Sequence, residues 1–268
     1  MEHARAGSLS ALERALRRDR LWIAVGLTLV LAPVWLWLAR ASLDMYGEMT
    51  GASAWMMAAR WDATYTALIF AMWTAMMVGM MLPSATPALL VFARVARSGP
   101  EPERPVLRTA LFAAGYLVAW TVFSAAATLI QRTLATRALV TPMMESASPY
   151  LAAALLALAG VYQWSAAKRS CLVRCRTPMQ FLVERWQPGT WGALRLGAEH
   201  GLYCVGCCWA LMLLLFAGGV MSLYWIAGLS LFVLYEKIGP ATRFSDRAVG
   251  AALVAAGAAL ALAHVVRG

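Results

Sequence analysis

Long apolar runs recur along the whole chain, and the short segments between them carry most of its charge. A run of about 20 apolar residues is the length that crosses the hydrocarbon core of a bilayer as a helix. Of the 268 residues, 62% are hydrophobic and 13% are charged; an ordinary soluble domain has roughly 25% charged residues. The sequence therefore predicts an all-α, polytopic membrane protein with one transmembrane domain, residues 21–268, after a basic cytoplasmic tail, residues 1–20.

Seven segments of the chain have the length and composition of membrane-spanning helices. They are residues 21–39, 65–93, 107–130, 149–167, 199–219, 222–237 and 247–266. The second contains Pro83 and Pro87, and we expect it to bend or break there because proline removes a backbone donor and clashes with the preceding turn. Only residues 218–221 join the fifth and sixth spans, which predicts an antiparallel hairpin. The seventh is rich in Ala and Gly, which lets helices approach closely.

The distribution of basic residues predicts the orientation. Eighteen of the 23 Lys and Arg fall in the N-terminal tail and in the second-to-third, fourth-to-fifth and sixth-to-seventh connections. Basic connections stay on the cytoplasmic side during insertion, so we expect a cytoplasmic N-terminus. The net charge of +10 is then a topology signal. Because no nucleic-acid-binding motif accompanies it, we expect the lipid bilayer, and no nucleic acid, as a partner.

Three cysteines cluster in the stretch "HGLYCVGCCWALM" of the fifth span. At about 100° per residue of an α-helix, His200, Cys204, Cys207 and Cys208 fall within an arc of roughly 100°. All the cysteines lie at or near the predicted cytoplasmic side, where a reducing environment disfavours structural disulfides. The stripe is typical of a metal site or of a redox-active C-x-x-C pair, and packing of small residues is the third interpretation.

Other groups could extend such a site on the cytoplasmic side. Cys171 and Cys175 lie four residues apart in the basic fourth-to-fifth connection. If that segment is helical they share a face, and we interpret them as a surface pair that hands a metal onward, or as ordinary cytosolic cysteines. Glu236 ends the sixth span beside Lys237. A carboxylate at membrane depth indicates function, and at a span end an interfacial ion pair is the alternative.

Methionine is concentrated in the second span and in the predicted external loops. The second span carries a ridge of Met72, Met76 and Met80, flanked by Met77 and Met81. The loops carry Met45, Met49, Met143 and Met144. Methionine is also a flexible gap-filler, so each group has a packing alternative. Because thioether and thiolate ligands select Cu(I), the pattern favours copper, although the same thiol stripe would also hold zinc.

Three stretches resemble the signature blocks of a bacterial family of predicted metal-binding integral membrane proteins. They are "AMMVGMMLPSATP", "YQWSAAKRSCLVRCRTP" and "HGLYCVGCCWALMLLLFAGGVMSLYWIAGLSLFVLYEK". Family members associated with polyphenol oxidases are treated as copper chaperones or copper-delivery factors. The resemblance covers about residues 62–265 and departs from the family at Ser165-Ala166, where the family has Thr-Pro. It implies metal-binding positions at Met76, Met77, Met80, Met81, Cys171, Cys175, His200, Cys204, Cys207, Cys208 and Glu236.

The residues and the resemblance together predict a multi-pass protein of the bacterial inner membrane that binds copper, as Cu(I), and passes it to a cuproenzyme or a partner chaperone. We expect ligand exchange and no catalysis. A membrane thiol–disulfide oxidoreductase using Cys204 and Cys207, or a structural subunit of a membrane complex, are the alternatives. The absence of a phosphate-binding loop, a nucleophile elbow and a carboxylate dyad argues against hydrolytic functions. The oligomeric state and the recipient stay open.

Overall fold

The computed structural model describes residues 2–47, 60–98, 103–239 and 243–267, with backbone alone for 2–20, 243–246 and 267. This part of the chain is helical, apart from turns and one isolated bridge between Val140 and Ser146. The helices are α1 (Glu2–Met45), α3 (Ala63–Ser98), α4 (Pro105–Thr136), α5 (Pro149–Gln163), α6 (Ala166–Arg176), α7 (Pro178–Arg185), α8 (Gly189–Met212), α9 (Leu215–Gly218), α10 (Leu223–Ile238) and α11 (Arg243–Arg267). The predicted all-α class is confirmed.

Five segments among the described residues are long and apolar enough to cross a membrane. They are Leu21–Met45, Ala63–Ser98, Pro105–Thr136, Gly189–Gly218 and Arg247–Val266. The pair α5 and α6 would count as a sixth, although it is bent by 66° at their junction. The remaining predicted span coincides with α10, which has only 16 residues. The predicted fourth span, residues 149–167, is longer than helix α5, which ends at Gln163.

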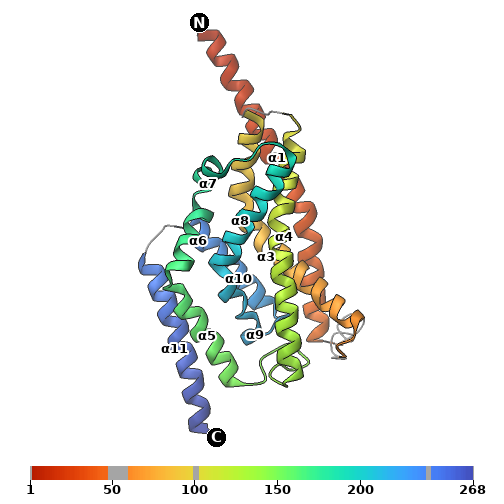
Figure 1. Ribbon diagram of the computed structural model, residues 1–268, viewed down its shortest axis with the longest axis vertical. Helices are drawn as coiled ribbons and strands as arrows, with labels where there is room; N and C mark the ends of the chain where they lie inside the picture. The colour runs from red at the N-terminus through yellow and green to blue at the C-terminus, as the bar shows by residue number, and fades with distance from the viewer. Residues whose placement is uncertain (1, 48–59, 99–102, 240–242, 268) are drawn as a thin grey trace.

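The long helices run roughly along the longest axis of the molecule, with the two termini at opposite ends (Figure 1). The most extensive helix contact joins α4 to α8, and α3 packs on the other side against α4 and α1. The pair α5 and α11 forms a second unit beside this group (Figure 1). The short helices α6 and α10 approach each other between the two units.

Glycines bring the backbones of the paired helices together. A Cβ atom at Gly115 of α4 would lie 2.0 Å from the carbonyl oxygen of Leu194 in α8. Between α5 and α11, a Cβ atom at Gly160 would lie 2.7 Å from the carbonyl oxygen of Gly250. The Ala- and Gly-rich composition of the last helix therefore does allow the close approach expected for it.

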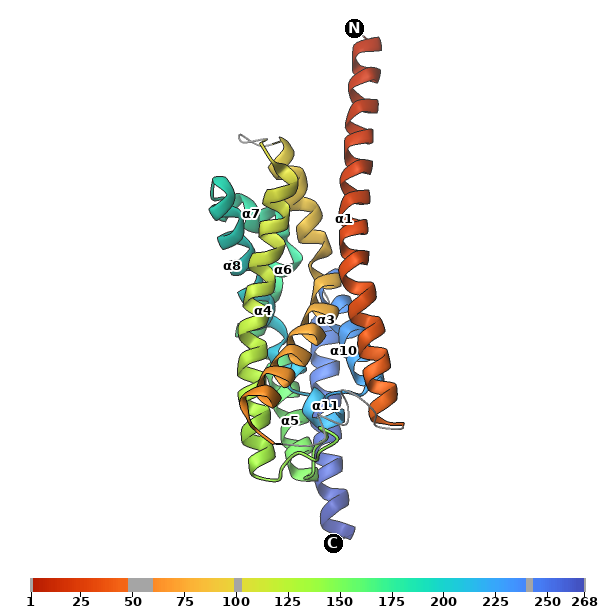
Figure 2. The same ribbon diagram turned by 90° about the vertical axis from the view of Figure 1, so that its right-hand side faces the viewer.

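Helix α3 runs without interruption from Ala63 to Ser98, although Pro83 and Pro87 lie inside it. Figure 2 shows it changing direction partway along its length. Of the two expected outcomes, a bend or a break, the helix therefore shows the bend. Pro83 lacks the N–H that would bond to the carbonyl of Gly79. The indole Nε1 of Trp35 in α1 donates to that carbonyl instead, at 3.2 Å.

The two carbonyls that follow in α3 also receive side-chain donors. The Ser230 hydroxyl of α10 donates to the carbonyl of Met80 at 3.2 Å. The Tyr116 hydroxyl of α4 donates to the carbonyl of Met81 at 3.0 Å, and the Ser84 hydroxyl donates to the same oxygen at 2.8 Å. Side chains of three neighbouring helices thus donate hydrogen bonds to the backbone carbonyls of the bent segment. Proline is tolerated in a membrane-spanning helix when neighbouring helices supply such bonds. The bend is also where α4 and α10 converge on α3.

The connection between α8 and α10 differs from the expected tight hairpin. It contains the short helix α9 and turns at Gly219, whose φ of 96° favours glycine. The buried ring of Phe216 in α9 packs against Trp73 of α3, with ring centroids 5.2 Å apart. As a result α10 packs mainly against α3 and only lightly against α8. The chain does reverse direction here, but the predicted pairing of the two helices is wrong.

Candidate metal centre

Three buried thiols gather on one face of α8. The Sγ atoms of Cys204, Cys207 and Cys208 all lie within 4.8 Å of one another, and each side chain is at most 1% exposed. Spacings of three and four residues place side chains on the same face of a helix, as the sequence pattern indicated. Because α8 begins at Gly189 and not near residue 199, the thiols lie in its interior and not in its first turns.

Hydrogen bonds within α8 hold the sulfur atoms together. The thiol of Cys207 donates to the backbone carbonyl of Cys204 at 3.1 Å, and the thiol of Cys208 donates to the same oxygen at 3.0 Å. Both side chains therefore point back along the helix toward Cys204. All five cysteines of the chain are free thiols. The three sulfurs are close enough together to hold a single ion.

Side chains from two other helices contact the sulfur of Cys204. The Tyr116 hydroxyl of α4 lies 3.0 Å from its Sγ, and the Lys237 ammonium of α10 lies 2.9 Å from the same atom. Lys237 also donates to the Ser84 hydroxyl of α3 at 2.6 Å. Lys237 was not predicted as a site residue. The signal for it was its rarity, because the chain contains only two lysines against 21 arginines.

Methionines of α3 share the apolar cluster that contains the thiols. Met76, Met77 and Met80 are fully buried in the same apolar cluster as the three cysteines. Met81 comes closest to them, with its Sδ 4.0 Å from the Sγ of Cys208. A thioether beside a thiol is a soft-ligand environment. Of the predicted methionine positions, Met81 is therefore the one best placed to join a metal site.

Helix α6 adds the two remaining cysteines. Cys175 is 8% exposed, and its thiol lies beside those of Cys204 and Cys207. Cys171 is half-buried against α8, where a Cβ atom at Gly206 would lie 2.7 Å from its Sγ. The predicted exposed pair is thus wrong for Cys175, because the bend after α5 folds α6 back onto α8. Cys171 is therefore partly exposed, and Cys175, one turn later, is buried beside the thiols of α8.

A buried ion pair fixes α6 in this position. The Lys168 ammonium of α6 donates to both carboxylate oxygens of Glu236 in α10, each at 2.7 Å, and both side chains are buried. Arg176 at the other end of α6 donates through Nε to the backbone carbonyl of Glu236 at 2.7 Å. The ion-pair alternative for Glu236 holds, although the pair is buried and its partner is Lys168. Lys237 points elsewhere because successive helical residues diverge by about 100°. Glu236 therefore positions the cysteine-bearing helix α6.

His200 is buried one turn before Cys204, on the same face of α8. Its ring lies among three aromatic rings, with centroid distances of 5.9 Å to Phe112, 6.0 Å to Tyr116 and 5.4 Å to Phe181. The Nδ1 atom has no hydrogen-bond partner among the described residues. His200 lies outside the close group of three thiols. It borders the thiol site from within an aromatic pocket.

The methionines predicted for the external loops are not exposed where the structure describes them. Met45 and Met144 are fully buried in the apolar core, Met143 is partly buried against it, and Met49 lies outside the described residues. Nearby, the Tyr46 hydroxyl donates to Glu145 at 2.6 Å. Burial and the adjacent carboxylate raise the pKa of Tyr46 to about 12. These contacts tie the end of α1 to the turn before α5.

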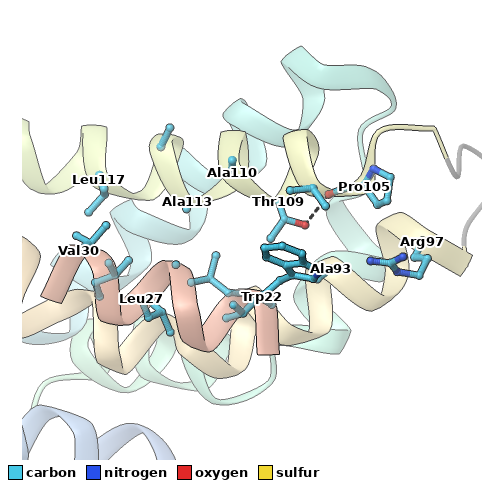
Figure 3. Close-up of a pocket in the computed structure, with 16 residues that line it drawn as sticks. Trp22, Leu27, Val30, Ala93, Arg97, Pro105, Thr109, Ala110, Ala113 and Leu117 are labelled. Atoms are coloured by element: carbon cyan, nitrogen blue, oxygen red, sulfur yellow. Dashed lines mark hydrogen bonds between the residues drawn. The ribbon is translucent and has the colours of Figure 1, made fainter. Parts of the chain in front are cut away.

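A separate apolar cavity of about 400 Å³ lies between α1, α3 and α4 (Figure 3). Leu27 and Val30 of α1 face Leu117 of α4 across it, and Arg97 of α3 lies near one end (Figure 3). Among the described residues, no cysteine, histidine or methionine lines it. The cavity therefore offers no soft ligand, and the candidate metal centre is confined to the thiol group between α3, α4, α6, α8 and α10.

Comparison with known protein families gives a match over most of the chain. The family model PpoB2, described as a copper chaperone, matches residues 70–260. No curated protein and no solved structure matches the chain. The matched range contains every cysteine, the methionines of α3, and Lys168, Glu236 and Lys237.

Proposed function

This chain belongs to the PpoB2 family of copper chaperones, and on that premise we propose that it is a membrane-embedded protein that binds copper and delivers it to a cuproenzyme. The observation that carries the proposal is the buried group of three thiols within 4.8 Å of one another. Free thiols in an apolar interior beside a thioether form a soft-ligand site. Copper is therefore cargo here, and the chemistry required is exchange of ligands without catalysis.

We propose Cu(I) as the bound form, with Cys204, Cys207 and Cys208 as its ligands. Soft thiolate and thioether ligands select Cu(I) over harder divalent ions. Cys175 and Met81 border the group and could each supply one further sulfur. Zinc sites more often include histidine or carboxylate ligands. The close thiol group contains neither of these.

Delivery requires a route between the buried thiols and a partner protein. Cys171 is partly exposed and packs on α8, and Cys175 follows it one turn later beside the buried group. We propose that copper passes along these sulfurs one ligand at a time, so that each step breaks one metal–sulfur bond as another forms. The partner would then dock on the cytoplasmic face formed by α6 and α7.

For the topology, we propose seven crossings of a bacterial inner membrane with a cytoplasmic N-terminus. Helices α1, α3, α4, α5, α8, α10 and α11 follow the seven predicted apolar segments in order. Their alternating directions are consistent with an odd number of crossings, since the two termini lie at opposite ends (Figure 1). The bias of basic residues toward the predicted cytoplasmic connections supports this orientation.

The proposal is tested by the metal content of the purified full chain. We expect about one copper per chain after loading with Cu(I), and X-ray absorption dominated by sulfur neighbours. The double variant Cys204→Ser with Cys207→Ser should lose the copper, whereas Ala210→Ser should keep it. Ala210 is a matched control because it is a buried position on the same helix. Zinc or iron in place of copper, retained in the double variant, would overturn the proposal.

The same preparation separates this function from the oxidoreductase alternative. A redox role predicts that Cys204 and Cys207 form a reversible disulfide, which thiol trapping under aerobic and reducing conditions detects. Copper delivery predicts that both thiols stay trappable under air until Cu(I) is added, after which they are protected. The redox role also leaves Cys208, Cys175 and Met81 without a function.

A further inference from the structure

Lys237 carries a positive charge into the thiol group. Its side chain comes from α10, is buried, and reaches Cys204 with its ammonium 2.9 Å from Sγ. The hydroxyl of Ser84 in α3 accepts a second hydrogen bond from it at 2.6 Å. A binding site for a cation rarely has a fixed cation beside one of its ligands, because the two positive charges repel each other.

The groups packed around Lys237 indicate what balances its positive charge. The nearest carboxylate in sequence, Glu236, is engaged by Lys168. The ammonium contacts the thiol of Cys204 and the hydroxyl of Ser84, and the hydroxyl of Tyr116 lies across the same sulfur. The thiols of Cys175 and Cys207 are further groups near it. The sulfur of Cys204 is therefore the closest group able to carry negative charge toward Lys237. Any ion bound to Cys204 shares that sulfur with a lysine.

We propose that Lys237 determines which metal the site accepts, favouring monovalent Cu(I) over divalent Zn²⁺. The inference rests on the proposed copper-binding function. An ion bound to Cys204 at the ~2.3 Å of a zinc–thiolate bond lies within about 5 Å of the ammonium, since Nζ is 2.9 Å from the same sulfur. At that distance, with an effective dielectric constant of ~20, the second charge of Zn²⁺ weakens its binding relative to Cu(I) on the order of 10²-fold.

The geometry around Cys204 acts in the same direction. Lys237 donates a hydrogen bond to its sulfur, so part of the coordination capacity of that atom is already used. A structural zinc site needs four ligands in a tetrahedron. Cu(I) can be held by two or three sulfurs, which Cys207 and Cys208 supply together with Cys204. Lys237 thus favours a site of low coordination number as well as low charge.

The test measures Cu(I) and Zn²⁺ affinities of the full chain in detergent by competition with chromophoric chelators. The neutral variants are Lys237→Met, which removes the charge, and Lys237→Gln, which also keeps a donor for Ser84. The matched control is Lys237→Arg, which keeps the charge. We expect both neutral variants to bind Zn²⁺ on the order of 10²-fold more tightly relative to Cu(I) than the wild type does, and the arginine variant to stay near the wild-type ratio.

The outcomes separate this inference from the proposed function. A wild type that binds no Cu(I) overturns the proposed function. A wild type that binds Cu(I), with neutral variants that keep its Zn²⁺-to-Cu(I) affinity ratio, overturns the role of Lys237 alone. Neutral variants that elute as the wild type but lose both metals would also overturn it, because Lys237 would then hold Cys204 in place without discriminating between ions.

Discussion

Replacing Lys168 by Met should release α6 from α10 without changing any cysteine of the sequence. Lys168 donates at 2.7 Å to both oxygens of Glu236, and the two side chains are 2% and 6% exposed. Removing one partner of a buried ion pair leaves the other charge uncompensated, which costs about 3–5 kcal/mol. Arg176 still holds the far end of α6 through the carbonyl of Glu236, so we expect local opening more than global unfolding. At the lower figure, the population of the opened state rises by on the order of 10²-fold.

The assay is the alkylation rate of Cys175, which α6 holds at 8% exposure. Mass spectrometry of the full chain in detergent measures the modified fraction of its peptide over time. When closing is faster than alkylation, the rate follows the population of the opened state. We therefore expect the Lys168→Met variant to react on the order of 10²-fold faster than the wild type. Arg185→Met on the neighbouring helix α7 is a control, because Arg185 is exposed.

A second variant identifies the cause. Changing both partners, Lys168→Met with Glu236→Met, removes the uncompensated charge and leaves apolar side chains of similar length. Such replacements of whole buried pairs are often neutral or stabilising. The double variant should therefore return toward the wild-type rate. If it reacts as fast as the single variant, or if the single variant reacts no faster than wild type, the reasoning from the buried charge is refuted.

Three further predictions concern the surrounding scaffold. The sulfur of Met81 lies 4.0 Å from the Cys208 thiol, and Met81→Leu removes it while keeping a side chain of similar size. We expect the Cu(I) affinity, measured by chelator competition, to fall about 10-fold. The control Met72→Leu, on the same helix, should leave that affinity unchanged. Gly115→Ala forces a Cβ atom to within 2.0 Å of the Leu194 carbonyl and should lower stability by about 1–3 kcal/mol or more, seen as a lower thermal midpoint, whereas Gly228→Ala, with open space around it, should not lower it. Trp73→Phe removes the 2.6 Å hydrogen bond to buried Gln131, and a midpoint equal to wild type would contradict the expected cost of about 1–3 kcal/mol.

Much of the fold could be predicted because the length of an apolar run and the identity of its flanking residues are local properties. A helix lies at each expected span, and the Ala- and Gly-rich helix α11 does pack closely. What could not be predicted depends on contacts between distant residues. The path of α3 past Pro83 relies on donors from other helices, including Trp35. The α8–α10 pairing failed because Phe216 of α9 packs on α3.

In the candidate site, too, the features set by local sequence were predictable and those set by contacts between helices were not. The common face of Cys204, Cys207 and Cys208 follows from helix geometry alone, so the sequence was sufficient. The partners of Cys204 were not predictable, since Tyr116 and Lys237 come from other helices and have ordinary interpretations in the sequence. Cys175 was expected at the surface, because no local pattern reveals the 66° bend that turns α6 inward.

The two lysines have a consequence for chemical labelling. Lys168 and Lys237 are the only lysines of the chain, and both side chains are buried, the first paired with Glu236 and the second in contact with Cys204. An amine-reactive reagent therefore finds no lysine on the surface of the folded protein. Any acylation of a lysine under native conditions marks the moment at which α6 or α10 has moved away from its neighbours. For this chain, the rate of lysine acylation therefore measures how often the interior opens, whereas in most proteins it reports on the surface.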